Sequence, residues 1–142
     1  MTRRDLILLL PAVLVPLQAE TGSSLRGRLR QEPGGAPVLI PEGGGAVVLE
    51  GDPDTINVLR DPRLKAEEFE VHGTAAPPDA FRIDPIHSRS LFVWRKGRKL
   101  VITYWCEVCA IRAWTPGKCQ CCQDDLALDP RDPALKDTDP SD

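Results

Sequence analysis

The sequence has little histidine, the side chain most often used in general acid–base catalysis. Its 142 residues include only two histidines, His72 and His87, and no Gly-x-Ser-x-Gly motif. His87 is followed directly by Ser88, and neighbouring residues of a strand point to opposite faces, so the two form no base–nucleophile pair. We expect His72 on the solvent-facing side of its strand and His87 in a hydrogen-bonded position. The three glycines at 43–45 precede an expected strand rather than a helix, so no phosphate-binding loop is indicated and no catalytic activity is expected.

A basic excess is also missing. The formal net charge is −3, and the acidic residues gather near the C-terminus, where residues 124–142 hold seven aspartates against Arg131 and Lys136. Residues 20–123 hold 14 basic and 13 acidic side chains. Proteins that grip nucleic acid through its phosphates carry a strong basic excess. Nucleic acid is therefore not the expected partner, which leaves an unidentified protein or small ligand.

No apolar run is long enough to cross a bilayer. The longest stretch covers residues 6–17 and is interrupted by two prolines. It follows Arg3 and Arg4 and is closed by a polar segment with Ala19, an arrangement typical of an export signal. We expect residues 1–19 to be such a signal, with no stable membrane span after its removal and with a periplasmic or extracellular location. The twin-arginine route and an ordinary secretion signal both remain open.

Short strands are expected over most of the region between residues 22 and 105. Apolar and polar residues alternate there in short runs that Gly, Pro and Asp separate. A period of two is typical of half-buried strands. One short helix is expected over residues 55–60, and residues 91–94 and 100–105 are expected to pair as a hairpin.

The order of these elements resembles an OB-fold. A first strand, Leu-Arg-Gly-Arg-Leu-Arg, is followed by a Gly-Asp turn, the helical segment, a Phe-Glu-Val-His-Gly-Thr strand and a Phe-Arg-Ile-Asp strand. This resemblance covers residues 24–87 and implies a small closed barrel. We therefore predict a mainly β chain with an OB-like β-barrel over residues 22–90. A two-sheet sandwich fits the same pattern less economically.

Four of the five cysteines form two pairs of equal spacing, Cys106-x2-Cys109 and Cys119-x2-Cys122. Each pair closes a loop that can present two thiolates to one tetrahedral metal ion. Nine residues with a Pro-Gly turn separate the pairs, enough for a short strand, a turn and a return. We predict that these four cysteines hold a structural Zn²⁺ ion in a zinc-ribbon-like knuckle, which together with the hairpin occupies residues 91–128.

Other uses of the same cysteines stay open. Outside the cytoplasm, paired cysteines usually form disulfides, and a single iron, copper(I) or a thiol-exchanging pair would also use these side chains. Cys121 lies inside the second pair, where it could replace Cys119 or Cys122 as a ligand or remain free. We assign Cys122 because its spacing mirrors that of the first pair. A reactive Cys121 in a periplasmic thiol-redox or copper-handling protein is the alternative function.

The C-terminal third of the chain carries a second resemblance. The run Leu-Val-Ile-Thr-Tyr-Trp-Cys-Glu-Val-Cys-Ala-Ile-Arg, followed by Thr-Pro-Gly-Lys-Cys-Gln-Cys-Cys-Gln, resembles the C-terminal knuckle of uncharacterised exported bacterial proteins. That resemblance implies a fold and a location but no activity. Five of the seven aromatic residues lie between Phe92 and Trp114, where they form either a stacking surface or, as we favour, the packing between ribbon and barrel.

The remaining residues, 129–142, are rich in Asp and Pro and are expected to form a disordered acidic tail. Together these features favour an exported, metal-stapled binding or assembly module without catalytic activity, in which the barrel presents the binding face.

Overall fold

The computed structural model describes residues 22–134, so the predicted export signal lies outside the described residues. The described chain is mainly β, with 43% strand and 12% helix. The strands are β1 (Ser23–Arg30), β2 (Val38–Pro41), β3 (Val47–Glu50), β4 (Glu68–Ala76), β5 (Ala80–Ile83), β6 (Leu91–Arg95), β7 (Arg98–Val101), β8 (Tyr104–Cys106), β9 (Ile111–Ala113) and β10 (Ala127–Leu128). The helical elements are α1 (Pro53–Leu59) and two 3₁₀ turns, η1 (Pro62–Leu64) and η2 (His87–Arg89). No helix within residues 22–134 is long and apolar enough to cross a membrane.

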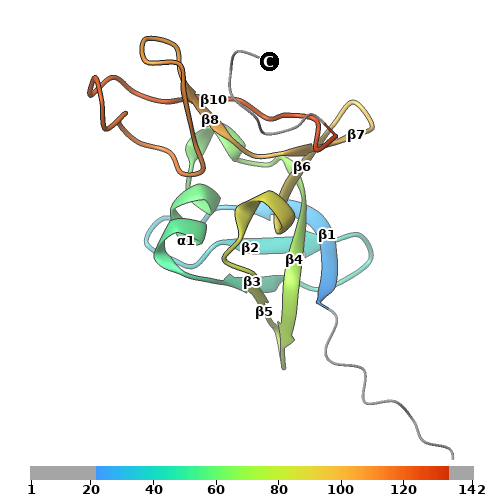
Figure 1. The fold of residues 1–142 in the computed structure, drawn as a ribbon. Helices are drawn as coiled ribbons and strands as arrows, with labels where there is room; N and C mark the ends of the chain where they lie inside the picture. The colour runs from blue at the N-terminus through green and yellow to red at the C-terminus, as the bar shows by residue number, and fades with distance from the viewer. Residues whose placement is uncertain (1–21, 135–142) are drawn as a thin grey trace, which may run out of the picture.

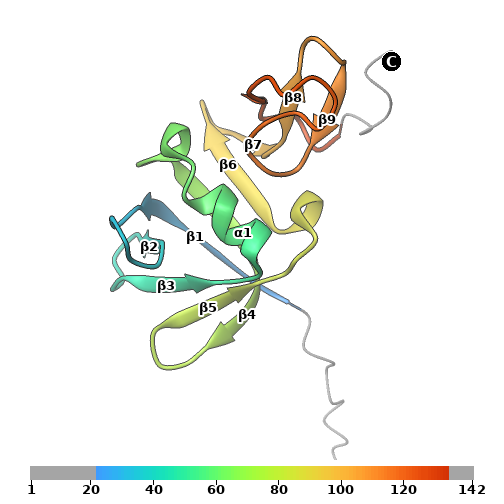
Figure 2. The same ribbon diagram turned by 90° about the vertical axis from the view of Figure 1, so that its left-hand side faces the viewer.

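Five strands close into a small barrel (Figures 1 and 2). They pair in the order β1-β2-β3-β5-β4, and β1 pairs back onto β4. The β3–β5 pairing is parallel, whereas the other four are antiparallel. This closed barrel and the cysteine cluster that follows it confirm the fold class predicted from the sequence, and they are consistent with the OB-like resemblance.

Two glycines allow the strands to close. A Cβ atom on Gly27 of β1 would lie 2.5 Å from the carbonyl oxygen of Ile40, and one on Gly73 of β4 would overlap the carbonyl oxygen of Arg82. Gly73 is also the point at which β4 has β1 on one side and β5 on the other. A side chain at either position would therefore push neighbouring backbones apart where the barrel is tightest.

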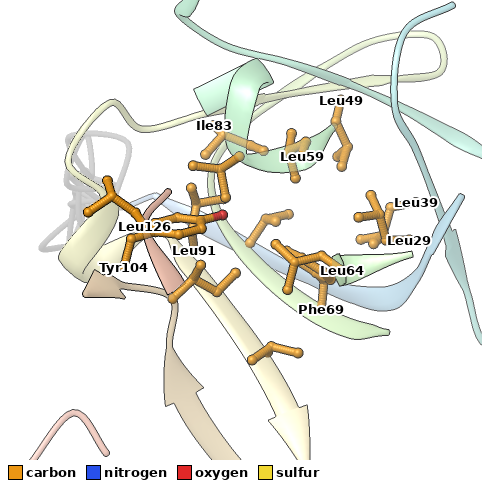
Figure 3. Close-up of a cluster of buried hydrophobic side chains, with 14 of the residues drawn as sticks. Leu29, Leu39, Leu49, Leu59, Leu64, Phe69, Ile83, Leu91, Tyr104 and Leu126 are labelled. Atoms are coloured by element: carbon orange, nitrogen blue, oxygen red, sulfur yellow. The ribbon is translucent and has the colours of Figure 1, made fainter. Parts of the chain in front are cut away.

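Helix α1 closes one end of the barrel (Figure 2). It begins two residues before the predicted segment, because the Asp52 side chain accepts a hydrogen bond from Thr55 N at 2.8 Å and Pro53 occupies the first turn. Its buried face includes Val58 and Leu59. These side chains join the inward-facing residues of the strands in one core (Figure 3), together with Tyr104 and Leu126 from the C-terminal part of the chain.

Strands β6 and β7 form the predicted hairpin that follows the barrel strands. Strand β6 pairs with β4 and extends the barrel sheet, and a tight turn at Lys96 and Gly97, both with positive φ, leads into β7. The expected second strand, residues 100–105, is divided. Strand β7 ends at Val101, which forms a β-bridge with Arg131. Strand β8 begins at Tyr104 in a separate three-stranded sheet of order β10-β8-β9. This sheet and the two cysteine loops are called the ribbon below.

Residues 129–134, the first part of the predicted acidic tail, lie beside β7 of the seven-stranded sheet. Arg131 exchanges two backbone hydrogen bonds with Val101, at 2.7 and 2.8 Å, and Asp132 pairs with Arg98 at 3.0 Å. The rest of the predicted tail, residues 135–142, lies outside the described residues.

Candidate metal centre

Two loops of similar construction present the cysteines. In the first, Cys106 ends β8, Cys109 N donates to its Sγ at 3.4 Å, and Ala110 with φ of 52° turns the chain into β9. In the second, Cys121 N donates to Cys119 Sγ at 3.4 Å, and Gln123 has φ of 65°. Each residue with positive φ directly follows the second cysteine of its pair, so the backbone reverses at the same point in both loops.

The four predicted cysteines meet at one point. Their Sγ atoms all lie within 4.8 Å of one another, and those of Cys106 and Cys122 are 3.4 Å apart. Four sulfurs around one zinc ion at about 2.3 Å would be separated by about 3.8 Å. Cys106 and Cys119 are buried, whereas Cys109 and Cys122 are half-buried. Cys106, Cys109, Cys119 and Cys122 are thus positioned to bind a metal ion.

The local electrostatics differ between the thiols. Backbone N–H groups of Cys122 and Cys121 lower the pKa of the Cys119 thiol to about 7, so this side chain is ready to act as a thiolate near neutral pH. The neighbouring thiol of Cys121 raises the pKa of Cys109, because crowded thiols disfavour a further thiolate. A bound cation would reverse that preference by stabilising all four thiolates together.

Cys121, the fifth cysteine, is exposed and does not belong to the group of four. The equal spacing of the two pairs therefore predicts the same four cysteines that the fold brings together.

The second loop also docks on the barrel. Leu126, just after it, is buried in the barrel core, and its carbonyl accepts a hydrogen bond from Arg63 Nη1 at 2.9 Å. Arg63 pairs with the buried carboxylate of Asp61 at 2.9 Å, and Asp61 Oδ2 accepts from the Tyr104 hydroxyl at 2.8 Å. The sequence does not predict this network, because Asp61-Pro62 indicates only where the preceding helix ends.

His87 makes a second contact between the ribbon and the barrel. Its Nδ1 lies 3.1 Å from the carbonyl of Trp114 and its Nε2 3.0 Å from Thr55 Oγ1. A carbonyl can only accept, so Nδ1 carries a proton. The predicted hydrogen-bonded role of His87 is confirmed. His72 is half-buried on β4, with Nε2 2.7 Å from Glu70 Oε2 and its ring edge against Phe92.

The five aromatic residues between Phe92 and Trp114 differ in burial. Tyr104 and Phe92 are buried, so the expected packing role holds for them. Trp94, Trp105 and Trp114 are only half-buried. Arg26 covers the Trp94 ring at 3.8 Å from its centroid, and Arg112 lies 4.9 Å from that of Trp105.

The fold and the site together define a class of protein: an OB-like barrel carrying a four-cysteine ribbon, positioned to bind a metal ion. No family model matches the chain, and comparisons with curated proteins and with solved structures find no significant match.

Proposed function

We propose that the protein is an exported, non-catalytic binding or assembly module in which a structural zinc ion fastens the ribbon to the barrel. The proximity of the four Sγ atoms of Cys106, Cys109, Cys119 and Cys122 carries this proposal. Four thiolates in two short loops are a donor set typical of closed structural zinc sites. Such a site leaves no coordination position for a substrate, which favours a structural role.

The surroundings of the site support the same role. The second cysteine loop supplies Leu126 to the barrel core and an acceptor to Arg63. A metal ion that orders this loop would also hold the contacts between ribbon and barrel. His87 has both ring nitrogens engaged, with Thr55 and Trp114, so it is not poised as a general base.

Export is part of the proposal and depends on the sequence of residues 1–19, with its two arginines and short apolar run. The twin-arginine route carries folded proteins. It would let the metal bind before export and would keep the cysteines from forming disulfides outside the cytoplasm.

The exposed thiol of Cys121 favours a second candidate, a thiol-redox or copper-handling protein. Copper(I) prefers soft thiolate ligands, and a fifth cysteine beside four others would allow ligands to exchange. In this case one cysteine should react rapidly with alkylating agents in the native protein.

Metal content and free-thiol count, measured on protein exported by its own signal, separate the two candidates. One zinc per chain and one accessible thiol support the proposed module, whereas bound copper or paired disulfides favour the second candidate. Cys106→Ser should lose the metal and the folded ribbon together, and Cys121→Ser is the matched control that should keep both. A metal-free Cys106→Ser variant that is fully folded would overturn the structural role.

A further inference from the structure

The outer face of the ribbon carries a pocket that the metal centre does not use. Trp105 stands on the central strand β8, paired with Arg112 on β9 and with Ala127 on β10. A hollow of about 410 Å³ is lined by Trp105 and Ala127, with Glu107, Asp129 and Arg131 among its other walls. Arg112 also lines it, with its guanidinium 4.9 Å from the centroid of the Trp105 ring. Ala127 offers only a methyl group opposite the large indole, which leaves room beside the ring. The volume falls within the range of about 300–1,000 Å³ typical of small-molecule sites.

The walls of the hollow carry two cationic side chains, Arg112 and Arg131, and two anionic ones, Glu107 and Asp129. Arg112 donates to Asp129 Oδ2 at 2.9 Å and to Thr103 Oγ1 at 2.6 Å. Within residues 22–134, no hydrogen bond or ion pair engages the Glu107 carboxylate or the Arg131 guanidinium. The pocket thus offers one acceptor group and one donor group that a ligand can reach, beside an aromatic wall.

We propose that this pocket binds a saccharide. A sugar ring has an apolar C–H face that can lie on the indole, and hydroxyls that both donate to Glu107 and accept from Arg131. It also carries no net charge, which suits walls with two cationic and two anionic side chains. A phosphorylated ligand would meet the carboxylates of Glu107 and Asp129, and an organic cation would meet the two guanidinium groups, so neither suits the pocket as well.

The inference extends the proposed function by naming a ligand class, and it depends on that function in one respect. Trp105 is next to Cys106, so the pocket has its shape only while the ribbon is folded. Metal content and thermal unfolding of every variant must therefore be measured beside binding. A protein that lacks the metal contradicts the proposed metal centre. A protein that keeps its metal and fold but binds no saccharide contradicts the saccharide site alone.

The test uses the full metal-loaded chain on a glycan microarray, followed by calorimetric titration with cellobiose and N,N′-diacetylchitobiose and with AMP as a nucleotide probe. We expect binding to one class of glycan, lost in Trp105→Ala and partly kept in Trp105→Phe. Glu107→Gln should bind about tenfold more weakly, because a charge-assisted hydrogen bond is replaced by a neutral one. Val108→Ala, at a neighbouring exposed position, is the control and should bind as the wild type does.

Three results would overturn the proposal: no glycan bound by folded, metal-loaded protein; binding that survives in Trp105→Ala; or AMP bound more tightly than any sugar. If Trp105→Ala does not fold, the test uses Trp105→Phe and Glu107→Gln instead. Wild-type glycan affinity in both variants would also overturn the proposal.

Discussion

The hydroxyl of Tyr104 donates a hydrogen bond to Oδ2 of Asp61 at 2.8 Å, across the junction between ribbon and barrel. Both residues are buried, and Arg63 donates to both oxygens of the same carboxylate. One carboxylate therefore joins η1 of the barrel to β8 of the ribbon and, through Arg63, to the carbonyl of Leu126. A buried polar group that loses its partner costs about 1–3 kcal/mol. The network therefore stabilises the one arrangement of ribbon and barrel in which these side chains remain paired.

Tyr104→Phe should lower the free energy of unfolding by about 1.5–3 kcal/mol, the usual contribution of a hydrogen bond to a charged group. The ring stays in the core, so the change removes only the hydroxyl. Urea unfolding of Tyr104→Phe, Asp61→Asn and the double variant measures the coupling between the two residues. Effects that simply add would show that the hydrogen bond contributes nothing to the junction.

Acid should weaken the same junction. Burial alone would raise the pKa of Asp61, but hydrogen bonds from Arg63 and Tyr104 outweigh it and hold the pKa below its ordinary value of 3.8. A carboxyl with a lowered folded-state pKa adds stability above its unfolded pKa and loses it as pH falls through the folded pKa. The stability difference between wild type and Asp61→Asn should therefore be largest near neutral pH and shrink below about pH 4.

Urea unfolding of both proteins between pH 2 and pH 7 measures this difference. The two chains carry the same cysteines, so release of metal in acid affects both and cancels in the comparison. A difference that stays constant over the whole range would contradict the lowered pKa of Asp61.

Gly73→Ala should destabilise the barrel by about 3 kcal/mol or more, because the new Cβ would overlap the backbone carbonyl of Arg82 and no side-chain movement can relieve that. Gly45→Ala is the matched control, since a Cβ there meets nothing within 4 Å and its φ is not in the left-handed range. Thermal unfolding compares the two. Equal melting temperatures would show that β4 and β5 do not approach as closely as described.

The alternation of apolar and polar residues predicts β1, β4 and β5, each of which buries one face. The first strand illustrates this, because Gly27 and Leu29 are buried while Arg26, Arg28 and Arg30 are exposed. The alternation does not predict β2, where the neighbouring Val38 and Leu39 are both buried. The spacing of the cysteines predicts the metal centre, because a two-residue loop is local geometry.

Contacts between distant segments could not be predicted in the same way. Asp61 and Tyr104 are 43 residues apart, and a sequence does not show which polar residues will meet once both are buried. The break between β7 and β8 has the same cause. Residues 100–105 read as one strand, yet Val101 pairs with Arg131 and Tyr104 pairs with Leu128, two partners that only the folded chain brings alongside.

Removal of the metal should loosen the ribbon first and then weaken the barrel. Structural zinc contributes on the order of 10 kcal/mol to the folding of small zinc-binding peptides. We expect a chelator to abolish hydrogen-exchange protection in β8 and β9 and in the segment around Leu126. The melting temperature of the barrel should also fall, because Tyr104 and Leu126 belong to its core. Added zinc should restore both, and Cys121→Ser should respond as the wild type does. Unchanged protection in the ribbon after complete metal removal would mean that side-chain packing, and not the four thiolates, holds it in place.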